Sequence, residues 1–311
     1  MAFGECFGNL PLIGIIVANV QIKPLKRISM KQTISTLLMA AFAISVTSSA
    51  YAQKGKDKKD DPKYTNYFSD LEEAMETKVV VMEFTNAVSR MDMLKFKTKF
   101  TNSTNDFLLI DPSKFTVEVN GEEHHPNEKA FILDPNDKNS KTIDLKDGEN
   151  LRADEFEVTI AGVSRISLDG TPSKMEQFQL PASQNVMSAG NFEVNLKNLK
   201  QETKETWARF DIKYKGEGYA IIDPSRISVK TEGGDQYAND DSKSKSILLE
   251  KGDSKTVSAI FHIPAKVVDM QFAKLFVQWG DCMIETKAVP FDIDESVTFE
   301  LDAELTAEKN K

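Results

Sequence analysis

The sequence reads Leu109-Ile110-Asp111-Pro112-Ser113-Lys114-Phe115-Thr116-Val117-Glu118-Val119 at one place and, 112 positions later, Ile221-Ile222-Asp223-Pro224-Ser225-Arg226-Ile227-Ser228-Val229. In both stretches an apolar run ends at Asp-Pro, the chain turns, and an alternating pattern begins. A residue before proline is disfavoured in helical geometry, and the proline presets one dihedral angle of the turn. Apolar residues at every second position then mark a strand with one buried face. The sequence therefore predicts two copies of one β-domain.

Alternating strands recur around both stretches. Leu94–Phe100 places phenylalanine and lysine on opposite faces, and Trp207–Tyr214 matches it in the second copy. Phe100 and Tyr214 are therefore predicted to point into a core. Strands spaced about every 8–12 residues are typical of an antiparallel β-sandwich. The predicted fold class is all-β, with two tandem immunoglobulin-like antiparallel β-sandwiches after a cleaved signal peptide.

The predicted boundaries follow the two copies. The first sandwich is assigned to residues 75–181 and the second to residues 185–305, with Pro181-Ala182-Ser183-Gln184 as the linker. Because each copy carries its own Asp-Pro turn and its own strands, each is expected to fold alone. Residues 306–311 form a polar tail that is expected to fray.

The N-terminal part of the sequence has the pattern of an export signal. Basic residues precede an apolar run from Ile34 to Val46, and Ala50-Tyr51-Ala52 supplies the small residues that a signal peptidase reads. Residues 30–52 are therefore predicted to be a signal peptide that is cleaved before Gln53. The protein is accordingly expected to be secreted or periplasmic.

Residues 1–29 fit this signal badly, because a second apolar run from Leu10 to Val20 comes ahead of the basic residues. This favours a start at Met30, with residues 1–29 as an over-extended reading frame. A membrane anchor at residues 8–20 is the alternative, but the run is short and contains proline and asparagine. We expect no stable membrane insertion once the signal is removed.

Residues 53–74 are predicted to form a charged spacer and a short flap. Gln53–Lys63 is almost wholly polar and has little apolar surface to bury. Ser69 and Glu72 then have the spacing of a capping box, which favours a short helix at about residues 70–77.

Charge and cysteine content limit the function classes. The formal net charge is −9, and an acidic surface repels nucleic-acid phosphates and anionic lipids. Once Cys6 leaves with the leader, Cys282 has no partner for an intramolecular disulfide. The alternation around Cys282 predicts a buried structural thiol, and the cores must be stable through packing alone.

Histidine and acidic residues offer few candidates for a metal site. His124 and His125 are consecutive, so on a strand they point to opposite faces and do not readily bind one ion. The loop from Asp134 to Asn139 has calcium-like oxygen ligands at Asp134 and Asn136, but the rest of the loop breaks the pattern. We predict no metal and no cofactor, and keep Asp134 and Asn136 as candidate ligand-binding residues in an inserted loop.

Aromatic residues are the other candidates for binding. Trp207 lies in a strand whose neighbours are apolar, and it is expected to belong to the core. Trp279 comes at the end of a strand beside Gly280-Asp281, and it is expected to be exposed and available to a ligand. No nucleophile elbow, phosphate-binding glycine loop or paired-cysteine motif is present. The sequence therefore names no catalytic residue.

The order of these elements resembles that of the telokin-like immunoglobulin-like domains of secreted bacterial proteins. The motifs that carry the resemblance are the Ile-Asp-Pro-Ser strand ends, a leucine before Lys-Gly-Asp, and the strand that closes on Phe261-His262-Ile263-Pro264. The first copy departs from it with Thr159-Ile160-Ala161 in place of the proline. The resemblance covers residues 75–305 as two copies. It implies a fold and an extracytoplasmic setting, and no catalytic residue.

The sequence thus favours a non-catalytic binding or structural module that acts on an envelope protein or a polysaccharide, with no nucleic-acid partner. One alternative is a carbohydrate-binding module that uses exposed aromatic rings near Trp279. Another is an uncharacterised hydrolase. Exposed aromatic rings would favour the first alternative, and a cleft with His262 or His124 beside a carboxylate would favour the second.

Overall fold

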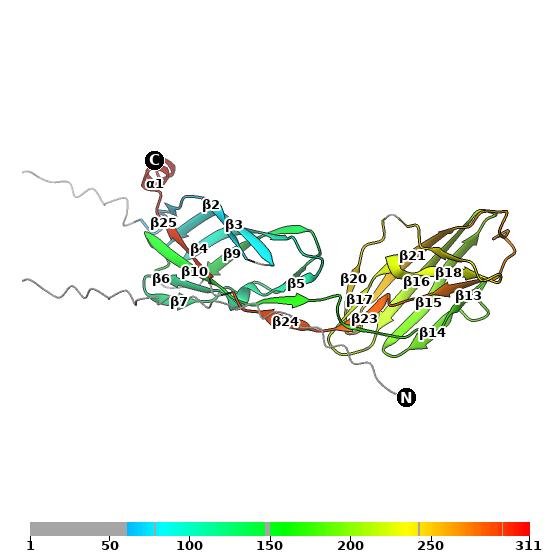
Figure 1. Ribbon diagram of the computed structural model, residues 1–311. Coiled ribbons are helices and arrows are strands. Elements are labelled where there is room, and N and C mark those ends of the chain that lie inside the picture. The colour runs from blue at the N-terminus through cyan, green and yellow to red at the C-terminus, as the bar shows by residue number, and fades with distance from the viewer. Residues whose placement is uncertain (1–60, 78, 147–149, 242, 294) are drawn as a thin grey trace, which may run out of the picture. The chain divides into compact units, whose positions relative to one another are not determined.

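The structure is a computed structural model, and it describes residues 61–77, 79–146, 150–241, 243–293 and 295–311 (Figure 1). All of them belong to one compact unit that begins at Gly55. The predicted reading-frame extension, the signal peptide and the spacer up to residue 60 lie outside the described residues. Among the described residues the structure is all-β apart from a short α-helix and two 3₁₀ turns, and no helix there has the length and apolarity to cross a bilayer.

Three antiparallel sheets surround a first core. Their strand orders are β1-β3-β4-β9 with β2 beside β3, then β25-β10-β6-β7, and β24-β11-β5-β8. The strands that build them are β1 (Asn66–Tyr67), β2 (Leu71–Glu76), β3 (Val80–Arg90), β4 (Met93–Asn102), β5 (Phe107–Ile110), β6 (Thr116–Val119), β7 (Glu122–His124), β8 (Phe131–Leu133), β9 (Lys138–Lys146), β10 (Glu155–Ile160), β11 (Val163–Ile166), β24 (Ala288–Phe291) and β25 (Glu295–Glu300). We call residues 61–166 and 288–311 the first region.

Three further antiparallel sheets surround a second core, in the orders β14-β15-β16-β21, β13-β22-β18-β19 and β12-β23-β17-β20. Their strands are β12 (Thr171–Pro172), β13 (Phe178–Leu180), β14 (Val186–Ala189), β15 (Phe192–Gln201), β16 (Glu205–Tyr214), β17 (Tyr219–Ile222), β18 (Ser228–Thr231), β19 (Gln236–Ala238), β20 (Ile247–Glu250), β21 (Ser254–His262), β22 (Leu275–Gln278) and β23 (Met283–Thr286). We call residues 171–286 the second region.

Each sheet of the first region has a counterpart in the second region with the same order of strands. The two regions differ in which part of the chain supplies one edge strand of two of these sheets. In the first region the strands beside β10 and β11 are β25 and β24, which come from the C-terminal end of the chain. In the second region the matching places are taken by β13 and β12, which come before the rest of that region. The chain therefore leaves the first region after β11 and returns to it at β24.

This pairing differs from the boundaries drawn at 75–181 and 185–305. The segment 288–300 pairs with 155–166 in the first region, and Phe178–Leu180 pairs with Leu275–Val277 in the second. The proposed linker at residues 181–184 thus follows a strand of the second region. Alternation shows that a segment is a strand but not which distant strand it joins, so this rearrangement leaves no local trace in the sequence.

The two Asp-Pro turns have the same local geometry, as the sequence predicts. Asp111 and Asp223 are extended, with φ and ψ of −114° and 91° in the first and −111° and 93° in the second. Each aspartate accepts hydrogen bonds from the serine two residues later, at 3.2 Å from its backbone nitrogen and 2.6 Å from its hydroxyl. Each turn is a 3₁₀ turn, η2 (Pro112–Lys114) or η3 (Pro224–Arg226), and the next strand follows it at once.

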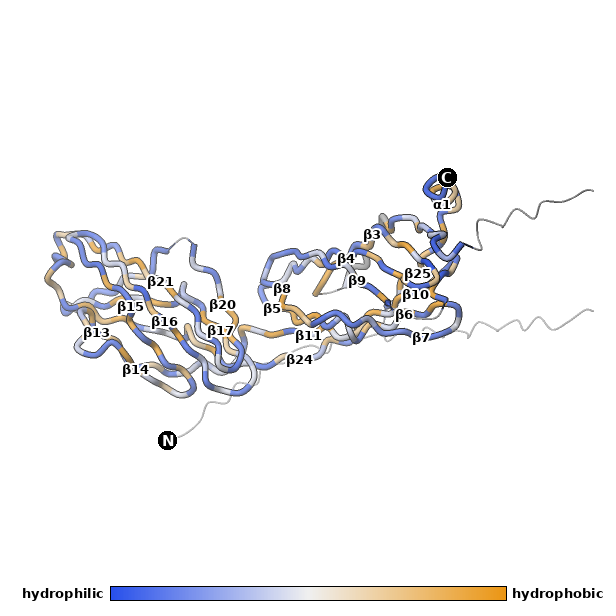
Figure 2. Tube along the Cα trace, turned by 180° about the vertical axis from the view of Figure 1, so that it is seen from behind, coloured by the Kyte–Doolittle hydropathy of each residue, from blue (hydrophilic) through white to orange (hydrophobic). Residues whose placement is uncertain are grey.

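Apolar and polar residues alternate along the strands (Figure 2), and the inward set forms two main cores. Phe100 and Tyr214 are fully buried, which confirms the predicted register of both strands. In the first core, rings from β3 and β4 meet rings from β10 and β25, and Phe156 stacks on Phe299 with centroids 4.4 Å apart. A smaller buried cluster joins Phe107 and Ile166 to Ile221.

Two local predictions are wrong. Residues 71–76 form β2 rather than a helix, and Leu71 lies opposite Phe84 of β3. Pairing with β3 gives the backbone its hydrogen-bond partners and overrides the local capping signal. The C-terminal tail is helical, as α1 (Ala303–Lys309), because the Asp302 side chain accepts from the backbone nitrogen of Leu305 at 2.8 Å.

Candidate binding surface

The most exposed large apolar side chain of the described residues is Phe272, which is 80% exposed. It lies in the loop from Pro264 to Lys274, which joins β21 to β22. This loop consists of two turns rather than alternating residues, so the sequence pattern gave no reason to select Phe272. The signal that could have found it is a large aromatic residue in a polar loop without strand periodicity.

The loop is held against the second region by a buried side chain and by hydrogen bonds. Met270 is fully buried, and its backbone carbonyl accepts a hydrogen bond from Nε2 of Gln201 at 2.9 Å. The same amide nitrogen lies 3.3 Å from the carbonyl oxygen of Ala273. Within the loop, the backbone nitrogen of Phe272 donates to the carbonyl of Asp269 at 3.2 Å. Phe272 thus projects from a loop held by bonds on both of its sides.

A polar groove of about 570 Å³ lies beside this loop. It is formed by the turn between β15 and β16, by the end of β21 and by the loop itself, and its lining residues are Gln201, Glu202, Thr203, Lys204, Glu205, His262 and Gln271. Amide, carboxylate, ammonium and imidazole groups in one groove can donate to and accept from a polar ligand. The exposed ring of Phe272 follows the lining residue Gln271 in the chain and lies outside the lining of the groove.

His262, the last residue of β21, lies near two carboxylates. Its Nδ1 lies 3.8 Å from Oε2 of Glu205, and its Nε2 lies 3.6 Å from Oδ2 of Asp240. Both distances exceed that of a hydrogen bond. No serine or cysteine is among the residues that line the groove. Thr203 is a hydroxyl side chain of the lining, and the groove thus offers charged, amide and hydroxyl groups to a ligand.

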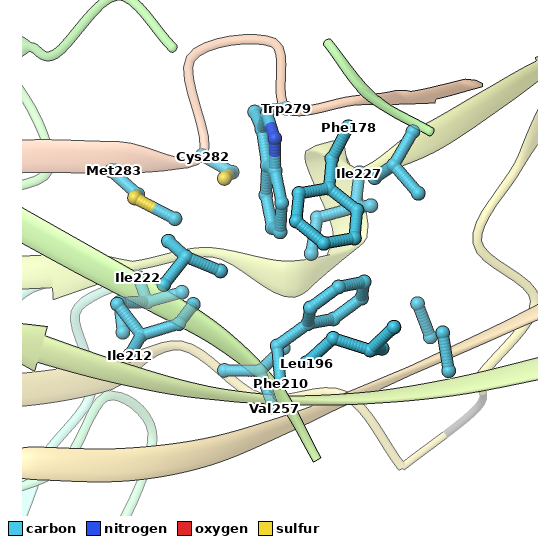
Figure 3. Packing of buried hydrophobic residues seen from close by; sticks show 14 of the residues in the cluster. Phe178, Leu196, Phe210, Ile212, Ile222, Ile227, Val257, Trp279, Cys282 and Met283 are labelled. Carbon is cyan, nitrogen blue, oxygen red and sulfur yellow. The ribbon is translucent and has the colours of Figure 1, made fainter. Parts of the chain in front are cut away.

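Trp279, predicted to be exposed, is buried. Its side chain is 2% exposed and packs edge-on against Phe210, with ring centroids 5.0 Å apart. Figure 3 shows its ring surrounded by Phe178, Ile227 and other apolar side chains of the second core. β22 ends just before Trp279, and the turn that follows folds the ring inward instead of outward. Trp207, predicted to be core, is instead partly exposed, because Thr206 and Ala208 take the inward positions of β16.

Asp134 and Asn136 lie in the first region and are not brought together with Trp279. Asp134 is exposed, and its backbone carbonyl accepts from Nδ2 of Asn102 at 2.9 Å. Asn136 has a positive φ of 53°, and its side-chain nitrogen donates to Oδ1 of Asn105 at 3.0 Å. These contacts fix the loop. Among the described residues no cluster of three or more histidine, cysteine, aspartate or glutamate side chains is placed to hold a metal ion.

His124 and His125 line a smaller groove of about 380 Å³ with Glu128 and Asp144. Nδ1 of His125 lies 2.8 Å from the backbone oxygen of Phe115, so this nitrogen is engaged within the protein. Burial raises the pKa of Glu128 and the nearby charge of Asp144 adds to the shift, whereas hydrogen bonds from the backbone oppose it. This groove lacks serine, threonine and cysteine among its lining residues.

Cys282 is a buried free thiol, as predicted. Its burial raises its pKa to about 12, and the negative charge of Asp223 contributes to the shift. A thiol with so high a pKa is neutral at physiological pH and is a poor nucleophile. Cys282 therefore belongs to the packing of the second core.

We expect the Cys282 thiol to resist an aromatic disulfide reagent at about pH 8 in the folded chain and to react once the chain is unfolded. Because the pKa is higher in the folded state, the unfolded chain ionises first as the pH rises. The contribution of the neutral Cys282 thiol to the free energy of unfolding is therefore complete below about pH 9, and it is lost as the pH approaches about 12. Rapid labelling of the native chain would show that Cys282 is accessible.

Comparisons with known proteins do not assign a family. No family model matches the chain, and no curated protein matches it. Among solved structures, a secreted serine protease, VesC from Vibrio cholerae, is 11% identical with a TM-score of 0.16, over 66% of this chain and 49% of the protease. A conserved domain protein from Bacillus anthracis is 10% identical with a TM-score of 0.20, over 75% of this chain and 91% of that protein. The matched part spans about half the length of the protease, and neither similarity supports an argument about function.

Proposed function

We propose that this chain is a non-catalytic, extracytoplasmic binding module of a bacterial envelope or secretome, and that it binds a polysaccharide or envelope protein through the end of the second region. The observation that carries the proposal is Phe272, an 80% exposed ring on a loop held by Gln201 beside a polar groove. An exposed aromatic ring next to fixed polar groups suits a ligand with both apolar and hydroxyl-bearing surfaces.

The proposed architecture is a pair of immunoglobulin-like sandwiches similar to telokin-like domains. The matching sheet orders of the two regions and their equal Asp-Pro turns support this proposal. The proposed extracytoplasmic setting is supported by the basic and apolar run ahead of Ala50-Tyr51-Ala52. The acidic composition supports a partner other than nucleic acid.

A polysaccharide is the ligand that we favour. In this proposal the aromatic ring that contacts the sugar is Phe272 and not the buried Trp279. Sugar rings offer C–H faces to an aromatic ring and hydroxyls to amide and carboxylate groups, and the groove has such groups at Gln271 and Glu205. In the hydrolase alternative, His262 or His124 would activate water, since each of these histidines lines a groove.

Phe272→Ala is expected to weaken capture of envelope material by at least about tenfold, or about 1.4 kcal/mol. The measurement is a pull-down from the native envelope with the wild-type and variant chains, with the bound polysaccharide and bound protein quantified separately. Val186→Ala is the matched control, because Val186 is another exposed apolar residue of the second region but lies in β14. Equal capture by all three chains would contradict the proposal.

A further inference from the structure

The outer face of the sheet β25-β10-β6-β7 is densely acidic. Inward positions of these strands, such as Val117, Phe156 and Phe299, are buried, so the alternate positions face outward. The outward residues are only glutamate, serine and threonine: Glu118, Glu123, Glu155, Glu157, Glu300, Thr116, Thr159, Ser296 and Thr298. None of the four strands contains lysine or arginine.

The strand register places these glutamates opposite one another. Glu118 lies opposite both Glu157 and Glu123, and Glu155 lies opposite Glu300. Like charges directly opposite on neighbouring strands are destabilising. Among the described residues, none of these carboxylates takes part in an ion pair. The described strands of this sheet therefore carry a row of like charges, and Arg152, which precedes β10, is the basic side chain that lines the same surface hollow as Glu118, Glu155 and Glu157.

The fold does not require this acidity. In the second region the matching sheet is β13-β22-β18-β19, and the corresponding outward residues are Gln179, Ser228, Lys230, Gln236, Ala238, Phe276 and Gln278. That set contains no carboxylate. The acidic face is thus a property of the first region alone, and it needs an explanation other than sheet formation.

The outer face of the opposite sheet, β1-β3-β4-β9 with β2 beside β3, carries a cluster of lysines on β4 and β9. Its outward lysines are Lys95, Lys97 and Lys99 on β4 with Lys138 and Lys146 on β9. Two acids on this face are paired, Glu83 with Lys99 at 2.8 Å and Asp144 with Lys146 at 2.7 Å. Lysines on an edge strand discourage edge-to-edge pairing, but β4 is an inner strand, so edge protection does not account for its three lysines.

The two faces lie on opposite sides of one core. Rings of β3 and β4 contact rings of β10 and β25, with Phe84 and Phe96 both against Phe299. Packed sheets are about 10 Å apart, with side chains of the outer faces pointing away from each other. The acidic face therefore cannot be neutralised by the basic face of the same molecule.

We propose that the acidic face of one copy of this chain docks on the basic face of a second copy. Because the two faces of one molecule are different surfaces on opposite sides, the contact is head-to-tail and each added copy presents a new free face. Matching of opposite charges relieves the repulsion between the facing glutamates and supplies specificity. The result is an open, salt-sensitive assembly of many copies of the chain. Such an assembly holds several copies of the proposed binding surface of the second region together.

Sedimentation velocity of the whole chain at increasing concentration tests this proposal. In about 0.1 M salt the sedimentation coefficient should rise with concentration. In about 1 M salt, where the Debye length falls to about 3 Å, it should return to the value of a monomer. A chain that stays monomeric in both salts would overturn the proposal, as would association that salt does not weaken.

Two variants with opposite defects sharpen the test. Glu118→Gln with Glu157→Gln removes charge from the acidic face, and Lys95→Gln with Lys97→Gln removes it from the basic face. Each double variant should be monomeric alone, whereas an equimolar mixture should form a complex of two chains and grow no further, because each retains one intact face. Persistent self-association of either variant would overturn the proposed faces.

The matched control is Glu232→Gln with Asp235→Asn, which removes two exposed carboxylates from the second region. It should associate like the wild type, and a loss equal to that of the acidic-face variant would show that only net charge matters. The acidic-face variant should also unfold at a temperature no lower than the wild type, because it removes a repulsion. This separates a lost interface from a lost fold.

Discussion

Phe299→Ala is expected to destabilise the first region by about 3–5 kcal/mol, although Phe299 comes 133 positions after Ile166 and beyond the whole of the second region. The ring is fully buried and stacks on Phe156 with centroids 4.4 Å apart and planes 8° apart. It also contacts Phe84 at 5.8 Å and Phe96 at 5.5 Å. Alanine would leave a cavity among three other rings that cannot easily collapse.

The position of the tryptophans makes this result easy to assign. Both tryptophans of the chain, Trp207 and Trp279, belong to the second region. Urea unfolding followed by tryptophan fluorescence therefore reports the second region, whereas circular dichroism reports both. We expect Phe299→Ala to lower the urea concentration at which the first region unfolds, which circular dichroism detects. The transition followed by tryptophan fluorescence should not change.

Thr298→Ala is the matched control, because Thr298 is the neighbouring residue of the same strand but faces outward and is exposed. Its effect should stay within about 0.5 kcal/mol. A comparable loss of stability in both variants would mean that the effect comes from the backbone pairing of β25 and that the ring is not part of the core. A shift of the fluorescence transition by Phe299→Ala would mean that the ring belongs to the second core.

The sequence was sufficient for many of the strands, but not for β2 and β25 and not for the pairing of distant strands. The burial of Phe100 and Tyr214, and the equal turns at Asp111 and Asp223, followed from alternation and from proline. These features depend on a residue and its near neighbours, so they are visible locally. The pairing of β25 with β10 depends on residues far apart, and neither strand carries a mark of its partner.

The candidate site was predictable only in kind. An exposed aromatic ring in the second copy was expected, but at Trp279, where a strand end suggested exposure and the following turn instead buries the ring. Phe272 lies in a loop without periodicity, and its exposure depends on how Met270 anchors that loop in the core. The oxygen-bearing side chains of Asp134 and Asn136 predict a ligand site. In the structure the side chain of Asn136 instead donates to Oδ1 of Asn105 and holds its loop in place.

The chain builds two main cores, and its last strands return to complete the first. Ending the chain after Lys287 removes β24, β25 and α1, and with them the edges of two sheets and the ring of Phe299. The second region keeps all twelve strands from β12 to β23 and its own buried cluster. The expected effect is therefore loss of one core and preservation of the other.

Backbone amide hydrogen exchange on the shortened chain measures this directly, because exchange resolves protection region by region. We expect β3, β4 and β10 to lose their protection, while β16, β17 and β22 stay protected and the fluorescence of buried Trp279 remains native. Full protection of both regions without residues 288–311 would show that the first core does not need the returning strands.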